Sequence, residues 1–117
     1  MTCDPVVPNA VTEWSVTAVP TYYALRHIRG PAWDASRPLR EQALWDEHAA
    51  FMHTLTDEGF VVLGGVLGGT AGALLIISAE SEDMIRTRLS EDPWHQSGHL
   101  EIGSIHPWTI LLNAGRL

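Results

Sequence analysis

The sequence predicts an α+β domain whose elements follow the order strand, helix, strand, strand, helix, strand, which is the ferredoxin-like βαββαβ pattern. Three observations predict it: a long amphipathic segment over 36–59, two apolar runs on either side of a glycine-containing turn at 68–70, and branched or aromatic runs at both ends of this region. Elements in this order form a four-stranded antiparallel sheet with two helices on one face.

The length of the chain limits its domain organisation. Its 117 residues are enough for one domain and too few for two. We expect the domain to span residues 20–117. Residues 1–19, rich in Val, Thr and Pro, are expected to form an arm outside it, in which 11–19 either adds an edge strand or stays disordered.

The first strand and the first helix have clear boundaries in the sequence. Thr21–Arg29 is rich in aromatic and branched residues and ends at Gly30-Pro31, which is typical of a strand followed by a loop. Ser36 is then predicted to cap a helix whose first turn accommodates Pro38 and which ends at Gly59.

Two apolar runs predict the second and third strands. The second begins with Phe60–Leu63 and the third is Ala73–Ile77, and the turn between them predicts an antiparallel hairpin. In both runs apolar residues follow one another without strict alternation with polar ones, so we expect the sheet to be covered on both faces. The helices cover one face, and a second copy of the chain is expected to cover the other, giving a homodimer.

The last third of the domain supplies a helix and a strand. Ser81 is predicted to cap a short helix with an acidic first turn and a basic end. Pro93 disfavours a helical conformation at Asp92, which predicts an extended exit with the carboxylate on a fixed turn. The final strand is predicted over Leu100–Leu112, and Pro107 within it implies a bulge or an edge position.

Composition and charge exclude several classes of partner. Seven arginines stand against fourteen acidic residues, and the formal charge of -7 repels nucleic acid and anionic membranes. No apolar run reaches the roughly 20 residues of a membrane span, and the first twenty residues do not resemble a signal peptide. Because Cys3 is the single cysteine, no intrachain disulfide is possible. We expect a cytoplasmic protein.

His48 and Asp92 are the candidate catalytic residues. His48 lies on the same side of the predicted helix as its apolar residues and therefore points towards the core, whereas His53 does not. An imidazole and a carboxylate on separate elements can together move a proton. The alternatives are that His48 is a core histidine bonded to a carbonyl and that Asp92 only makes a local turn.

Three further residues are candidates for substrate binding. Arg26 on the first strand can hold a substrate carboxylate or can pair with surface acids. Trp94 can form an aromatic wall of a pocket or pack at the edge of the core. Gly65, with Gly64 before it, marks a bulge or a place where a ligand approaches the backbone. No lysine or helix start follows with the spacing of a phosphate loop.

No metal site or cofactor is predicted. The chain has six histidines, and His95 and His99 have the i, i+4 spacing of two ligands on a helix. Gly98 and Pro93 favour a loop there, so the helical ligand geometry lacks support.

Several segments together resemble the YCII-related (YciI-like) family of the dimeric α+β barrel superfamily. They are Trp45–Met52, Gly59–Gly65, Asp92–Trp94 and Ile105–Trp108, in the family's order and within about residues 21–112. The resemblance implies a ferredoxin-like protomer, a dimer whose two sheets form a barrel, and a pocket in which His48 faces Asp92.

The resemblance also implies a class of chemistry. Family members with an assigned reaction are small cofactor-free lyases or isomerases of aromatic-ring catabolism, including a dehydrochlorinase. We therefore expect elimination or isomerisation of a small aromatic or cyclic molecule, with His48 as base and Asp92 orienting its ring. The alternatives are that Asp92 is itself the acid or base, that the protein binds a ligand without turnover, or that it is a cofactor-free oxygenase.

Overall fold

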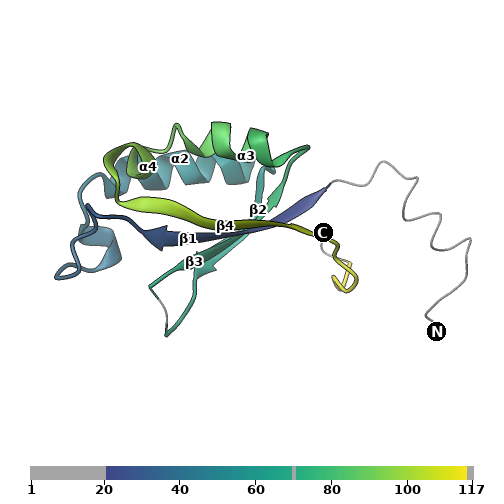
Figure 1. The fold of residues 1–117 in the computed structure, drawn as a ribbon, viewed down its shortest axis with the longest axis horizontal. Helices are drawn as coiled ribbons and strands as arrows, with labels where there is room; N and C mark the ends of the chain where they lie inside the picture. The colour runs from purple at the N-terminus through teal and green to yellow at the C-terminus, as the bar shows by residue number, and fades with distance from the viewer. Residues whose placement is uncertain (1–20, 70, 116–117) are drawn as a thin grey trace, which may run out of the picture.

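The computed structural model describes residues 21–69 and 71–115, and the predicted arm at 1–19 lies outside them. The described chain folds into one sheet covered by helices (Figure 1). None of these helices is long and apolar enough to cross a bilayer. In chain order the elements are β1 (Tyr22–Arg29), the 3-10 helix η1 (Leu39–Glu41), α2 (Trp45–Asp57), β2 (Val61–Val66), β3 (Ala73–Ser78), α3 (Glu82–Leu89), α4 (Pro93–Ser97) and β4 (Leu100–Trp108).

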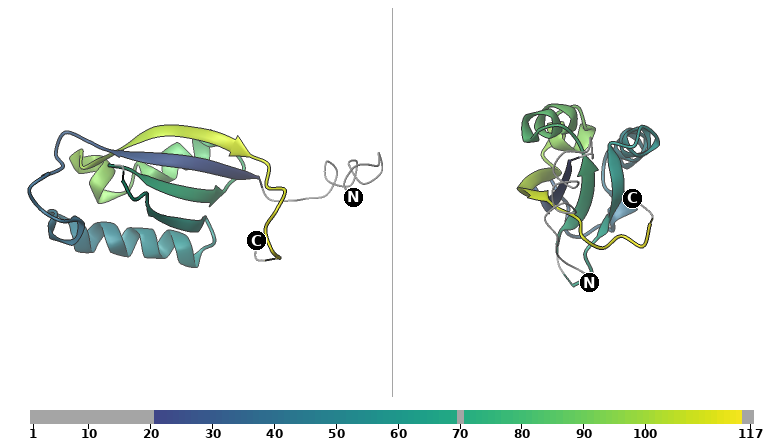
Figure 2. Two further views of the ribbon diagram at one scale, coloured as in Figure 1. Left: turned by 90° about the horizontal axis from the view of Figure 1, so that it is seen from below. Right: turned by 90° about the vertical axis from the view of Figure 1, so that its right-hand side faces the viewer.

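The sheet has the strand order β2-β3-β1-β4, and all neighbouring strands are antiparallel. The helices α2, α3 and α4 lie on one face of it in both orthogonal views (Figures 1 and 2). The ferredoxin-like fold is therefore confirmed. Pro107 lies in the edge strand β4, where a missing ladder donor is tolerated, while the irregularity in this strand pair falls between Arg26 and His27 of β1.

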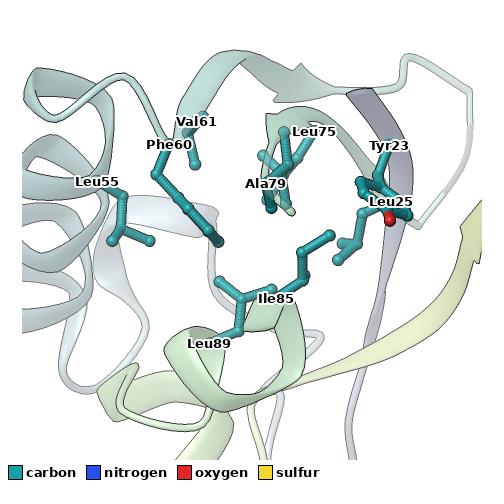
Figure 3. Close-up of a cluster of buried hydrophobic side chains, with 10 residues drawn as sticks. Tyr23, Leu25, Leu55, Phe60, Val61, Leu75, Ala79, Ile85 and Leu89 are labelled. Atoms are coloured by element: carbon teal, nitrogen blue, oxygen red, sulfur yellow. The ribbon is translucent and has the colours of Figure 1, made fainter. Parts of the chain in front are cut away.

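The core lies between the sheet and the helices (Figure 3). Alternate residues of β1 and β3 point into it, as expected for strands with one face against helices. Its fully buried members come from four elements, and they are Leu25, Ile77, Leu55, Ile85 and Leu89. This packing fixes the positions of α2 and of the segment after α3, which together carry the candidate site.

The first helix starts later than the sequence predicts. Ser36 does not cap it, because its backbone N–H and hydroxyl both donate to the carboxylate of Asp34. The Gln42 side chain then holds the loop by donating to the carbonyls of Asp34 and Arg37. Leu44, at a φ of 66°, separates η1 from α2, so the predicted single helix is divided. Local side-chain bonds have here outcompeted helix formation.

The chain around Asp92 also differs from the prediction. Asp92 is extended, as Pro93 requires, but Pro93 then begins α4 instead of a loop. His95 is consequently helical, and the left-handed Gly98, at a φ of 85°, ends the helix before His99. The last strand ends at Trp108, four residues before the predicted end.

The homodimer stays a prediction. Large apolar side chains are exposed in the single chain, notably Leu63 and Val66 on β2 and Leu111 and Leu112 after β4. Exposed large apolar side chains are typical of a protein interface when they form a contiguous patch. They agree with a second copy of the chain covering part of this surface.

Gly30, directly after β1, packs closely against the backbone of Gly98 and His99, which precede β4. Its N–H donates to the carbonyl of His99, and a Cβ at position 30 would collide with the carbonyl oxygen of Gly98 and lie 2.9 Å from its carbonyl carbon. Because backbone cannot move aside as a flexible side chain does, we expect Gly30→Ala to lower the free energy of unfolding by about 2 kcal/mol. Gly65→Ala, whose Cβ would meet nothing within 4 Å, is the control in urea denaturation.

Candidate active site

Asp92 is held in a fixed position before α4. Its carboxylate accepts a hydrogen bond from the backbone N–H of Trp94 at 2.9 Å, which caps the helix that Pro93 begins. Asp92 is fully buried. A buried carboxylate requires further donors, so the identity of its second partner decides what the residue can do.

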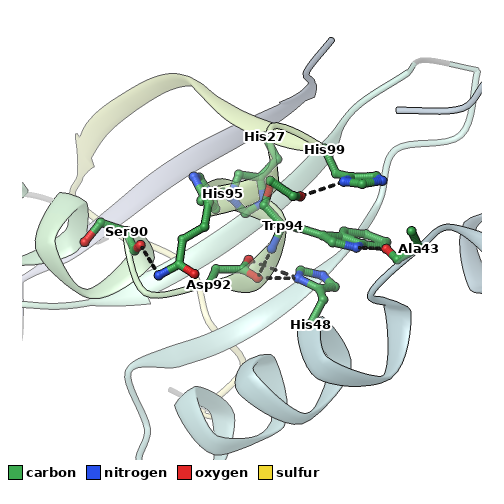
Figure 4. Close-up of polar contacts among 10 residues, drawn as sticks. His27, Ala43, His48, Ser90, Asp92, Trp94, His95 and His99 are labelled. Atoms are coloured by element: carbon green, nitrogen blue, oxygen red, sulfur yellow. Dashed lines mark hydrogen bonds and ion pairs between the residues drawn. The ribbon is translucent and has the colours of Figure 1, made fainter. Parts of the chain in front are cut away.

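That partner is His48. Its Nδ1 lies 2.9 Å from both carboxylate oxygens of Asp92, although His48 is on α2 and Asp92 directly precedes α4 (Figure 4). A carboxylate can only accept, so Nδ1 carries the hydrogen and donates it, and the neutral ring then has its lone pair on Nε2. Within the described residues nothing hydrogen-bonds to Nε2. The two predicted catalytic residues therefore meet, and the geometry leaves a basic nitrogen available.

Trp94 fixes the plane of the His48 ring. The two rings are stacked, with centroids 4.0 Å apart and an interplanar angle of 10°. The indole is itself anchored, because its Nε1 donates to the carbonyl of Ala43 at 2.7 Å and its ring is 99% buried. These contacts hold the plane of the His48 ring. Trp94 also borders the cavity, although it is only 1% exposed, and its role as an aromatic wall for a ligand stays a prediction.

A cavity of about 490 Å³ adjoins the His48 ring. This volume lies in the range of small-molecule sites, and the lining is mostly apolar and aromatic with few polar groups. The lining comes from β1, from α2 and the loop before it, from the β2–β3 hairpin, and from α4 and the start of β4. The residues are His27, Arg29, Trp33, Leu39, Trp45, His48, Met52, Thr56, Val61, Val62, Leu63, Gly64, Gly65, Val66, Ala71, Gly72, Ala73, Leu75, Trp94 and Leu100.

Of the two remaining candidates for substrate binding, Gly65 lines the cavity and Arg26 does not. Gly65 lines the cavity, and a Cβ there would meet nothing within 4 Å, which agrees with close approach of a ligand. Arg26 alternates with the buried residues Leu25 and His27 and therefore points to the opposite face of the sheet. Within one chain it does not reach the His48–Asp92 pair, and its role in substrate binding stays a prediction.

A second pair of histidines lies beside the site. The Nε2 atoms of His27 and His95 are 2.8 Å apart, so one ring donates an N–H to the nitrogen of the other. Burial lowers the pKa of His27 from its ordinary value of 6.5 to about 3, and the neighbouring His95 adds to this shift. Burial also lowers the pKa of His95. Both rings are therefore neutral near pH 7, and His27 borders the cavity.

The shifted pKa of His27 predicts how stability depends on pH. As pH falls below 6.5, the unfolded chain binds a proton at this residue while the folded chain resists binding until about pH 3. The unfolded state thus gains protons first, and we expect the free energy of unfolding to fall across this window. Replacing His27 with Gln should make the free energy of unfolding depend less on pH, as measured by urea denaturation from pH 7 to 4. His53→Gln, which removes an exposed histidine outside the pair, is the control, and an equal slope in all three proteins would contradict the prediction.

No arrangement of ligands for a metal ion is present in residues 21–69 and 71–115, where no three His, Cys, Asp or Glu side chains gather suitably. His95 and His99 do not form the pair that their spacing allows. His95 bonds to His27, whereas the His99 ring stacks on the opposite side of the cluster against Trp94, at 5.7 Å and 16°.

Comparison with known families decides the relationship that the sequence segments suggest. The model of the YCII-related domain matches residues 23–109, which is well over half of the chain. The chain belongs to the YCII-related family. The matched region of this YCII-related protein contains both His48 and Asp92 and every residue that lines the cavity. No curated protein matches the chain.

Proposed function

We propose that this YCII-related protein is a small enzyme that needs no cofactor and transfers a proton with His48 and Asp92. The observation that carries the proposal is the contact of His48 Nδ1 with both oxygens of Asp92 beside an apolar cavity. A histidine serving only the core would need one acceptor and no cavity. The proposed substrate is a small aromatic or cyclic molecule, because indole and imidazole rings form the inner wall.

The His48–Asp92 pair can carry out either elimination or isomerisation, because both reactions begin with the removal of a proton. His48 Nε2 removes a proton from a carbon of the substrate, and Asp92 stabilises the imidazolium through the Nδ1–H bond. In elimination the electron pair of the broken C–H bond forms a double bond and expels the leaving group with its own pair. In isomerisation the imidazolium returns the proton to a different carbon. Neither route consumes an oxidant or a reductant.

We also propose that the protein works as a homodimer in the cytoplasm. Its exposed apolar residues Leu63 and Val66 support the first part of this proposal. Its single cysteine supports the second, because the fold requires no oxidising compartment.

The proposal can be tested by screening for proton exchange and turnover. The protein, treated with a chelator, would be incubated in D₂O with a panel of small cyclic compounds that carry acidic C–H bonds and leaving groups, and followed by proton NMR. We expect deuterium incorporation or product from at least one class, and we expect His48→Gln to reduce the rate to background while circular dichroism stays unchanged.

The outcomes separate this reaction from its alternatives. Equal rates in the parent and in His48→Gln would contradict His48 as the base. Saturable binding without exchange or turnover would favour a ligand-binding protein instead. Oxygen uptake that accompanies turnover would favour an oxygenase and would also contradict the proposed proton transfer.

A further inference from the structure

The arginines divide into two groups by their partners. Three of the six in the described chain form ion pairs with carboxylates, and these pairs are Arg37–Asp34, Arg86–Glu82 and Arg88–Glu58. Arg26 points to the face of the sheet away from the site. The remaining two, Arg29 and Arg40, have no ion pair within the described residues, and each lies over a tryptophan of the candidate site.

Arg29 is linked to the proposed base by a series of ring contacts. Its guanidinium carbon lies 4.7 Å from the centroid of Trp33. Trp33 meets Trp94 edge to face at 5.4 Å, and Trp94 is stacked on His48. Arg29, Trp33 and Trp94 all border the cavity. The exposed guanidinium thus lies at the border of the same cavity as His48.

Arg40 lies over a second tryptophan of the candidate site, Trp45. Its guanidinium carbon lies 5.4 Å from the centroid of Trp45, whose ring is 6.0 Å from His48 and 5.7 Å from Trp94. Arg40 does not itself line the cavity, so it adds positive potential behind the aromatic wall and leaves direct contact to Arg29.

The charged side chain that lines the cavity is opposite in sign to the net charge of the protein. The chain carries a net charge of -7, yet among the described residues no aspartate or glutamate lines the cavity, and Arg29 is the one permanently charged residue that does. The N–H groups of a guanidinium lie in its own plane. When its face lies over an indole, two of them at its edge can donate parallel hydrogen bonds to a carboxylate. Arg29 is exposed, so its guanidinium is accessible to a ligand at the rim of the cavity.

We propose that Arg29 binds a carboxylate of the substrate, and that the substrate is a planar ring compound with a single negative charge. The proposal rests on the proposed function of the same site and adds the chemical class of its substrate. One guanidinium fork matches a carboxylate, whereas a phosphate dianion would remain half neutralised. The carboxylate at Arg29 and the ring against Trp33 and Trp94 place the remainder of the molecule towards His48.

Binding of matched probes tests this inference without any knowledge of the true substrate. Calorimetric titrations would compare 2-naphthoate, the neutral 2-naphthamide and 2-naphthyl phosphate. For the parent we expect naphthoate to bind at least about tenfold more tightly than naphthamide and more tightly than the phosphate, since a charge-assisted fork contributes about that much. Arg29→Gln should abolish the preference, Arg29→Lys should retain part of it, and Arg40→Gln should reduce it about twofold.

Two matched variants make the result specific. Arg86→Gln removes an exposed arginine of α3 and should keep the parent preference. Arg26→Gln tests the other arginine that the sequence suggests for a carboxylate, and loss of the preference there instead of in Arg29→Gln would overturn the proposal. It would also be overturned if naphthoate bound no better than naphthamide or if the phosphate bound best. His48→Gln should still bind naphthoate with the parent preference, because Arg29 and the base act separately. A parent protein that shows this preference but no exchange or turnover in the substrate screen would contradict the proposed enzyme while supporting the carboxylate site.

Discussion

Replacing Asp92 with alanine is expected to lower the free energy of unfolding by about 3 kcal/mol, because the side chain has two structural roles in a buried place. The substitution removes the cap of α4, which alone contributes about 1 kcal/mol. It also leaves the buried Nδ1–H of His48 without its acceptor. Urea denaturation at a constant protein concentration would measure the change, with Asp46→Ala, an exposed residue of the first turn of α2, as control.

Asp92→Asn separates the two roles of this carboxylate. Its side-chain oxygen can still accept from the Trp94 N–H, so we expect a smaller loss of about 1 kcal/mol. The amide carries no charge to stabilise the imidazolium, so turnover should fall by about two to four orders of magnitude. A variant that kept both its stability and its rate would contradict a role for Asp92 beyond the helix cap.

The fold was predictable because its signals are periodic or local. The apolar face of the first helix placed His48 towards the core, and the structure confirms this with a relative exposure of 9%. The restriction that Pro93 imposes on its predecessor gave the extended conformation of Asp92. Both signals depend only on neighbouring residues, and the segments resembling the YCII-related family then supplied the expectation that the two side chains meet.

The rest of the site depends on contacts that no local pattern encodes. The strand period places His27 on the face of β1 that meets the helices, but its bond to His95 depends on α4, a segment for which the sequence predicts a loop. Arg29 and Trp33 meet because the chain turns after β1 at Gly30. For Arg26 the residue type alone suggests binding of a substrate carboxylate. The pleat of β1 turns its side chain to the face of the sheet away from the cavity.

Trp94→Ala is expected to cause the largest loss of stability, about 4 kcal/mol. Trp94 is 1% exposed, and its indole contacts four other aromatic rings, those of Trp33, Trp45, His48 and His99. Its removal also leaves the Ala43 carbonyl without its donor. Trp108→Ala, which removes an indole that is 44% exposed, is the matched control and should cost much less.

The Trp94 substitution also bears on how the base is held. Trp94→Phe keeps a ring beside His48 but loses the bond to Ala43, and we expect it to cost about 1–2 kcal/mol and to remain folded if the alanine variant does not. If stacking orients His48, Trp94→Leu should lower kcat more than Trp94→Phe at similar stability, because leucine offers no flat surface to the imidazole. Equal kcat values in the two variants would mean that the Asp92 bonds alone orient the ring, and the function of Trp94 would then be to pack α4 against α2.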